Sequence, residues 1–171
     1  MHCSYIITFI SDDRPGLVET IANTIRKCNG NWLESKLSQL GGKFAGLILV
    51  SVPQSAAAAL VQQLSDLEQG DISVSVTETS RETTSSDVHT VSLSIIGPDR
   101  SGIVQEVSRA LAVHRINVIE MDSKVSSAPM IAEMLFEARI SASIPEMLDV
   151  EQLRDSLDSI ADQMTLEIEM A

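Results

Sequence analysis

The chain has 171 residues, enough for one domain of ordinary size or for two small ones. Apolar residues make up 44% of it and aromatic residues only 3%, so its core must be built mainly from aliphatic side chains. The formal net charge of −12 argues against direct binding to DNA or RNA, whose phosphates an acidic surface repels. The charge is −3 over residues 1–86 and −9 over residues 87–171. This excess indicates a solvated acidic face on the second half or, alternatively, a surface for a basic protein partner.

Other features of the composition exclude several kinds of site. The two cysteines, Cys3 and Cys28, form no CxxC pair and have no histidine at metal-ligand spacing. This pattern predicts a reducing compartment and no metal site. The N-terminus lacks the basic region and cleavage site of a signal peptide, and no apolar run approaches the ~20 residues of a membrane span. We therefore expect a cytoplasmic protein without a membrane partner.

The first half of the chain shows a regular succession of apolar patterns. Alternating or continuous apolar runs predict strands, and apolar residues at helical spacing predict helices. Gly41-Gly42 is a signal for a two-residue hairpin loop, and Asn29-Gly30 is expected to end the first helix with Gly30 as a left-handed cap. In chain order we expect a strand over 5–10, a helix over 15–28, strands over 32–40 and 43–52, a helix over 55–67 and a strand over 71–77.

The second half repeats this order after a polar stretch. Residues 81–87 have no apolar period and are expected to link a first domain, 1–80, to a second domain, 88–171. In the second domain we expect a strand over 88–96, a helix over 101–114, strands over 117–125 and 131–140 joined by a longer hairpin over 126–130, a helix over 148–163 and a strand over 165–170.

Each half therefore has the order β-α-β-β-α-β. This order predicts an α+β fold of two tandem ferredoxin-like domains, each an antiparallel four-stranded sheet with two helices on one face. The open sheet edges need cover. Two copies could pair edge to edge into one eight-stranded sheet, and a homodimer could cover more.

A turn from strand to helix occurs twice, 86 residues apart. The first copy is Asp12-Asp13-Arg14-Pro15-Gly16-Leu17-Val18 and the second is Pro98-Asp99-Arg100-Ser101-Gly102-Ile103-Val104. The first N–H groups of a helix have no partner within it and can hold a carboxylate. Pro15 suits a first helical position, and the two glycines leave room for a ligand. One copy alone is explained by an ordinary helix start with a glycine for tight packing, whereas the repetition favours a duplicated site for a small anion or zwitterion.

These two motifs, followed by Asn31-Trp32 and Asn117-Val118, resemble the ACT-domain family over nearly the whole chain, as two tandem domains. With no catalytic domain attached, the chain is most similar to the glycine cleavage system transcriptional repressor group, which is also similar at 40–44, Leu-Gly-Gly-Lys-Phe. The resemblance implies regulation by a small-molecule amino acid, glycine or similar, with no cofactor. It also implies action through a partner transcription factor and no direct contact with nucleic acid.

In ACT proteins the ligand lies where two domains meet, between the loop after the first strand and the start of the second strand. Carried over to this chain, the resemblance implies a ligand-binding set of Asp13, Gly16, Leu17, Asn31, Asp99, Ser101, Gly102, Ile103 and Asn117. Ser101 replaces the proline of the motif, so the second site is either looser or uses the hydroxyl as a helix cap. The two aspartates stand where the family often has asparagine, and they would repel a carboxylate but hold an ammonium group.

No catalytic constellation emerges from the sequence. The histidines have no nearby nucleophile, no G-x-S-x-G elbow or phosphate-binding loop is present, and the acidic residues over 149–162 have the spacing of a solvated helix face. We therefore expect a non-enzymatic regulator. The runner-up is a detached regulatory subunit of an amino-acid biosynthetic enzyme. A third reading is an acylphosphatase-like enzyme that cradles phosphate with Arg14 and Asn31, or with Arg100 and Asn117, against the opposing charge of the neighbouring aspartates.

Overall fold

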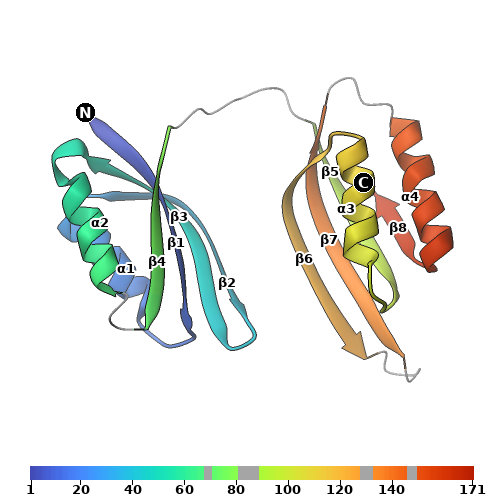
Figure 1. The fold of residues 1–171 in the computed structure, drawn as a ribbon, viewed down its shortest axis with the longest axis horizontal. Helices are drawn as coiled ribbons and strands as arrows, with labels where there is room; N and C mark the ends of the chain where they lie inside the picture. Colours follow the sequence, from blue (N-terminus) through green and yellow to red (C-terminus); the bar gives the residue numbers. More distant parts are fainter. Residues whose placement is uncertain (68–70, 81–88, 128–132, 146–149) are drawn as a thin grey trace. The chain divides into compact units, whose positions relative to one another are not determined.

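A computed structural model of the chain describes residues 1–67, 71–80, 89–127, 133–145 and 150–171. The chain divides into two compact units, Met1–Thr83 and Thr84–Ala171, each with its own sheet and core (Figure 1). The linker expected over 81–87 lies outside the described residues, as does most of the hairpin loop expected over 126–130. The domain boundaries at 80 and 88 therefore stay a prediction.

Both units have the expected β-α-β-β-α-β order. The first unit contains β1 (His2–Asp12), α1 (Leu17–Lys27), β2 (Asn31–Leu40), β3 (Lys43–Pro53), the 3-10 turn η1 (Gln54–Ala56), α2 (Ala57–Ser65) and β4 (Ile72–Thr79). The second unit contains β5 (His89–Pro98), α3 (Ile103–Val113), β6 (Asn117–Ser127), β7 (Met134–Ile144), α4 (Val150–Met164) and β8 (Glu167–Met170).

The strands of each unit form a four-stranded antiparallel sheet, in the order β2-β3-β1-β4 in the first and β6-β7-β5-β8 in the second. Each unit therefore has a four-stranded sheet of its own, and edge-to-edge pairing of the two sheets stays a prediction. In each unit the two helices lie on one face of the sheet (Figure 1). This confirms the predicted α+β fold of two tandem ferredoxin-like repeats.

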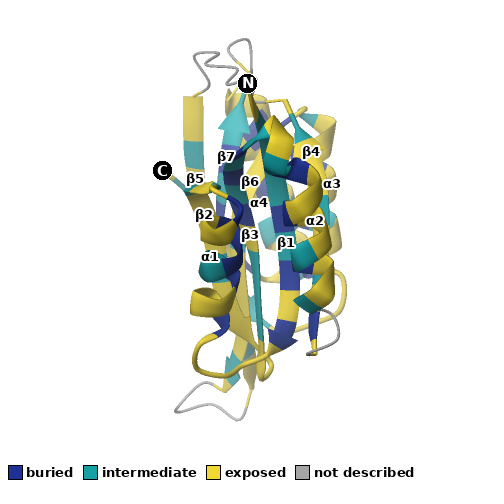
Figure 2. Ribbon diagram, turned by 90° about the vertical axis from the view of Figure 1, so that its left-hand side faces the viewer, coloured by how far each residue is buried: buried dark blue, intermediate teal, exposed yellow. Residues whose placement is uncertain are grey.

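Alternating burial along the central strands explains why the helices stay on that face. Ile7 and Phe9 of β1 are buried, whereas Ile10 on the opposite face is 49% exposed, and Figure 2 shows this alternation along the strand. Helix α1 meets the buried face with Ile21 and Ile25. Because a fully buried aliphatic side chain contributes about 1.5–3 kcal/mol, a handful of such contacts holds each helix on its sheet. None of the helices in the described parts of the chain is both long and apolar enough to span a membrane.

Two turns show which of the conformations predicted for the glycines are correct. Gly41 and Gly42 both have positive φ, 58° and 78°, and they join paired residues of β2 and β3, so the predicted two-residue hairpin loop is confirmed. Gly30 is not the left-handed cap, because the residue with positive φ is Asn29, at 53°. Gly30 is instead needed for close approach, since a Cβ there would lie 3.0 Å from the carbonyl oxygen of Ile25.

The two repeats differ on the sheet face away from the helices. In the first repeat this face carries Ile10 and Leu47, each about half exposed. In the second repeat it carries charged side chains, among them Lys124 and Glu137, which form an ion pair with 3.1 Å between Nζ and Oε2. The two repeats therefore share a fold and an apolar core beneath the helices, while the opposite faces of their sheets carry different side chains.

Candidate ligand-binding site

The repeated turn from strand to helix has the same backbone geometry in both repeats. Gly16 and Gly102 are left-handed, with φ of 89° and 99°, and each immediately precedes the first residue of its helix. The carbonyl oxygen of Gly16 accepts the first intrahelical hydrogen bond, 2.9 Å from the amide nitrogen of Thr20, and Gly102 does the same for Glu106. The backbone amides before these residues have no acceptor within their helices. Both turns therefore expose a helix N-terminus that lacks a side-chain cap.

Two details of the predicted turn are wrong. Pro15 does not stand at the first helical position, because α1 begins at Leu17 and Pro15 lies in the preceding turn. Ser101 does not cap α3, because Gly102 holds the N-cap position and no side chain makes a capping hydrogen bond at the start of the helix. The reason is the left-handed glycine, which redirects the chain just before each helix and leaves position 15 or 101 outside it.

The aspartate of each turn is anchored through its backbone. The amide of Asp13 donates to the carbonyl oxygen of Gly42 at 3.1 Å, and the amide of Asp99 donates to that of Met134 at 2.7 Å. Both residues are exposed, so their carboxylates lie at the surface beside the helix start. Next to the first turn, Lys43 forms an ion pair with Asp12, and this hydrogen bond and charge lower the pKa of the Asp12 carboxyl.

The predicted set does not come together within one repeat. Asp12, at the turn, pairs with Lys43, whereas Asn31 pairs with Ser51 at the other end of the same strand. The rise of a strand puts these ends about 26 Å apart. In the second repeat Pro98 pairs with Leu135 and Asn117 pairs with Ser143, eight residues further along β7. A pocket that used both the turn and the asparagine would need the turn of one copy of the repeat and the asparagine of another.

The same separation removes the acylphosphatase-like arrangement. Arg14 with Asn31, and Arg100 with Asn117, lie at opposite ends of their sheets and cannot hold one phosphate together. Over the described residues, no group of three or more histidine, cysteine, aspartate or glutamate side chains is placed to bind a metal ion.

The two apolar residues that follow the glycines behave as core residues. Leu17 and Ile103 are each almost fully buried, and each belongs to the hydrophobic core of its own repeat. Leu17 therefore offers a ligand little besides its backbone amide. The valines after them, Val18 and Val104, are 39% and 44% exposed and stand on the open side of the helix.

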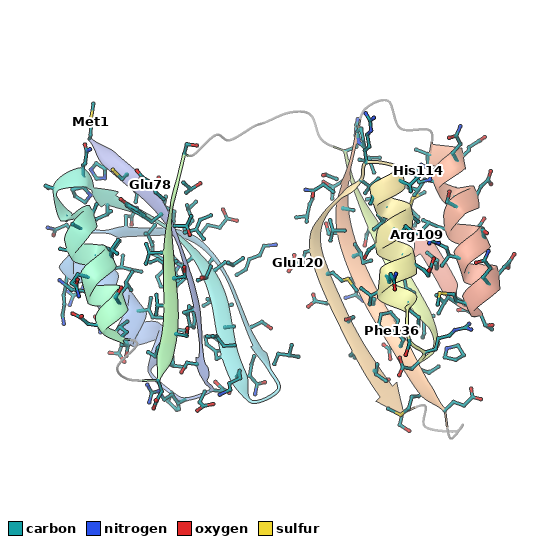
Figure 3. All side chains as sticks on the ribbon, viewed as in Figure 1. Met1, Glu78, Arg109, His114, Glu120 and Phe136 are labelled. Carbon is teal, nitrogen blue, oxygen red and sulfur yellow. The ribbon has the colours of Figure 1, made fainter. Side chains whose placement is uncertain are left out.

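A hollow of about 540 Å³ lies beside the turn of the second repeat. Phe136 lies at the end of the sheet where α3 begins, as Figure 3 shows, and His114 marks the other end of that helix. The hollow is lined by Asp99, Arg100, Gly102, Ile103, Val104, Gln105, Ser108, Val125 and Phe136. It thus contains three of the predicted site residues. Sequence reasoning missed the residues from β6 and β7, because only the fold brings those strands to the start of α3.

A second hollow, of about 450 Å³, lies on the sheet face away from the helices in the second repeat. Asp122, Lys124, Glu137 and Arg139 contribute to its lining. The Lys124 ammonium and the Ser126 hydroxyl, 2.9 Å from Glu137, both stabilise the carboxylate and lower its pKa.

Replacing Lys124 by methionine is therefore expected to raise the pKa of Glu137 toward its ordinary value. The stabilisation from the ion pair is present above the unfolded-state pKa of this glutamate and is lost as pH falls through its depressed folded-state pKa. An NMR titration of the Glu137 carboxyl carbon measures the shift. Ser126→Ala, which removes the weaker contributor, should give a smaller rise, and an unchanged titration in Lys124→Met would contradict the assignment of the pair.

These observations define a tandem protein of the ferredoxin-like α+β class, with an uncapped helix start in each repeat and a ligand-sized hollow at the second. The chain belongs to the ACT domain family, whose model matches residues 4–77 and 89–171.

Comparison with individual proteins is consistent with this family. The chain is 21% identical over 161 residues to the glycine cleavage system transcriptional repressor of Escherichia coli (strain K12), which covers 93% of this chain and 84% of that protein. An unknown protein from Galdieria sulphuraria has a similar structure, with a TM-score of 0.84, 24% identity and coverage of 99% and 98% of the two chains. A protein assigned as a glycine cleavage system transcriptional repressor gives a TM-score of 0.73 at 20% identity, over 100% of this chain and 97% of the other.

Proposed function

We propose that this chain is a non-enzymatic regulatory protein that responds to an amino acid and controls transcription of a glycine cleavage system through a partner protein. The observation that carries the proposal is the duplicated turn. In both repeats a left-handed glycine opens a helix start next to an exposed aspartate, and in the second repeat this turn borders a hollow large enough for an amino acid.

The two ends of an amino acid have matching groups at this turn. The free amides at the start of α3 carry partial positive charge and suit a carboxylate. The exposed carboxylate of Asp99, whose backbone is held by Met134, suits the ammonium group. A zwitterion uses both groups, whereas a phosphate or another plain anion would meet the aspartate as a like charge. This favours an amino acid over the phosphorylated substrate of an acylphosphatase-like enzyme.

The regulatory step is assigned to a partner protein because of the charge of the chain. The formal net charge of the chain is −12, of which −9 lies in the second half, so its surface repels the phosphates of DNA. The Escherichia coli relative is by name a transcriptional repressor. A transcription factor that binds DNA itself, and that this chain engages according to its ligand, reconciles the two observations. The alternative is a regulatory subunit of an amino-acid biosynthetic enzyme, which would use the same ligand site with a different partner.

Replacing Asp99 by asparagine is expected to weaken amino-acid binding about 10-fold or more. The substitution keeps the shape but removes the charge-assisted hydrogen bond to the ammonium group, a contact of about 1.5–3 kcal/mol. Isothermal titration calorimetry of the full chain against each of the twenty amino acids, beginning with glycine, measures the affinity. Asp122→Asn serves as the control, because Asp122 is an exposed aspartate of the same repeat that lies outside the hollow beside α3. Heats of binding absent for all twenty amino acids would refute amino-acid sensing.

The partner is tested by affinity purification of the full chain from its native cell, with and without the amino acid found by calorimetry. We expect a DNA-binding protein to co-purify in an amount that depends on the ligand. In a gel mobility-shift assay we expect the chain alone to leave the mobility of promoter DNA from glycine cleavage genes unchanged. A metabolic enzyme in its place would favour the alternative.

A further inference from the structure

The middle of the first sheet carries an uncharged and largely apolar surface on the face away from its helices. Helices α1 and α2 both lie on the other face (Figure 1), where Ile7 and Ile48 are fully buried. Because side chains alternate along a strand, the neighbours of these two isoleucines point the opposite way. Over the middle of β1 and β3 they are Ile6, Thr8, Ile10, Ala45, Leu47 and Leu49. We call this surface the open face of the first sheet.

The apolar residues of the open face form one continuous patch. Ile6 and Leu49 stand directly opposite each other in the register, and Leu47 follows two residues along β3. Leu47 is 51% exposed and Ile10 is 49% exposed, although both belong to the central strands of the sheet. A contiguous exposed apolar patch marks an interaction surface, whereas single scattered apolar residues need no explanation. The open face therefore calls for a partner whose own surface is apolar.

The corresponding face of the second sheet does not have this chemistry. The row that matches Lys36, Leu47 and Thr8 consists there of Asp122, Arg139 and Ser94. The next row brings Lys124 beside Glu137. Packing these charged groups against leucine and isoleucine would remove their water without replacing it by polar partners, which is costly. A second copy of the open face itself meets the requirement better.

The open face is large enough for a stable dimer. Strands β1 and β3 have 11 residues each, and the sheet has four strands. With a rise of about 3.4 Å per residue and about 4.8 Å between strands, the face measures about 650 Å². Two copies that cover each other would bury about 1,300 Å² in total, which lies within the range of specific protein interfaces.

The strand register makes the open face complementary to itself. Two neighbouring rows of outward-facing side chains cross the sheet, and each runs from a charged residue on β2 to a hydroxyl-bearing residue on β4. The rows are Lys36, Leu47, Thr8 and Ser75, and Glu34, Leu49, Ile6 and Thr77. A two-fold axis perpendicular to the strands and level with Ser35 lays each row of one copy on the other row of the second copy. Lys36 then faces Glu34, and Leu47 faces Leu49.

We propose that the open face of the first sheet is a homodimer interface, in which two copies of the chain pack face to face about this axis. The leucines and isoleucines form its apolar centre, and two pairs of Lys36 with Glu34 close it along β2. A two-fold axis parallel to the strands would instead lay β2 over β4, where Lys36 meets only hydroxyl groups. Edge-to-edge pairing would leave Leu47 exposed.

A charge in the apolar centre is expected to break the dimer. In Leu47→Glu each copy places a carboxylate against Leu49 and beside Glu34 of the other, so the dissociation constant of the dimer should rise at least about 100-fold. Sedimentation equilibrium of the full chain measures this constant. Val61→Glu, on the outer side of α2, and Ile96→Glu, on the charged face of the second sheet, change residues that are 38% and 39% exposed and should leave the dimer intact.

Exchange of the charges tests the axis. Glu34→Lys or Lys36→Glu alone brings like charges together twice per dimer and should weaken association about 10-fold. The double variant Glu34→Lys, Lys36→Glu should associate like the wild type. An equimolar mixture of the two single variants should form a mixed dimer that is tighter than either variant alone, and about 1 M salt should reduce all these differences.

The outcomes decide between the possible surfaces. A wild-type chain that is folded by circular dichroism and stays monomeric refutes the interface. A dimer that survives Leu47→Glu, or that Ile96→Glu disrupts in its place, also refutes it. A dimer that Leu47→Glu disrupts, but that neither the double variant nor the mixture restores, overturns the proposed axis. The interface does not depend on amino-acid binding, so calorimetry on Leu47→Glu tests the proposed function separately.

Discussion

Replacing Leu153 by alanine is expected to lower the free energy of unfolding of the second repeat by about 2–5 kcal/mol. Leu153 is fully buried on the inner face of α4, where it belongs to the core of that repeat. Its removal takes away apolar contacts and leaves a cavity that close-packed neighbours fill only in part. Since a domain is typically stable by only about 5–15 kcal/mol, this one change removes a large fraction of the stability.

The first repeat offers a matched variant and a fluorescent side chain that reports on the unfolding of that repeat alone. Leu60 of α2 is equally buried in the core of the first repeat. Trp32, the only tryptophan of the chain, belongs to that repeat, so its fluorescence follows the first core alone. In urea unfolding, Leu60→Ala should lower the midpoint of the transition followed by Trp32 fluorescence. Leu153→Ala should move that midpoint much less. It should instead lower the midpoint of the part of the far-ultraviolet circular dichroism change that comes from the second repeat. Equal shifts of both signals in Leu153→Ala would mean that the two cores unfold as one cooperative unit.

Replacing Gly102 by valine is expected to destabilise the second repeat by about 1–2 kcal/mol or more through the backbone alone. The φ of Gly102 is 99°, a region that L-residues with a branched Cβ adopt only under strain. No atom lies within 4 Å of a Cβ added there, so a steric clash contributes nothing. The strain falls on the residue that immediately precedes α3, and we expect the turn to shift and amino-acid binding at the second repeat to fall with stability.

A short series of substitutions separates strain from packing. Asparagine tolerates the left-handed region better than alanine, and alanine better than valine, so the loss at Gly102 should rise in the order Asn, Ala, Val. Gly16, with φ of 89° and equally open surroundings, should show the same order in the first repeat. Chemical denaturation measures each variant. A valine variant as stable as the wild type would show that the left-handed conformation is not required.

The element order was predictable because it depends on local patterns. Alternation along β1 and helical spacing along α1 reflect which side of each element is buried, and both are visible in the chain itself. Gly41-Gly42 specified a tight hairpin for the same reason, since two adjacent residues with positive φ need no distant partner. The repetition of the whole order after 86 residues then favoured two copies of one fold.

The candidate site was predictable only where it is local. The turn with its glycine and aspartate stands as expected in both repeats, but Pro15 and Ser101 were given roles that the left-handed glycines remove. The grouping of Asn31 with the turn came from the family resemblance. Within one repeat the structure puts Asn31 at the opposite end of the sheet, because β2 starts where β1 starts and runs parallel to it.

By itself, therefore, the sequence determined the two repeats, the order of their elements, the sheet faces that carry apolar residues and the position of the repeated turn. Only the tertiary structure decided that Lys36, Leu47 and Thr8 form one row on the open face of the first sheet, and that the corresponding row of the second sheet consists of Asp122, Arg139 and Ser94. The physical reason is register. Which residues of three strands stand side by side is set by pairing between segments far apart in the chain, and no local pattern specifies the surface that they form together.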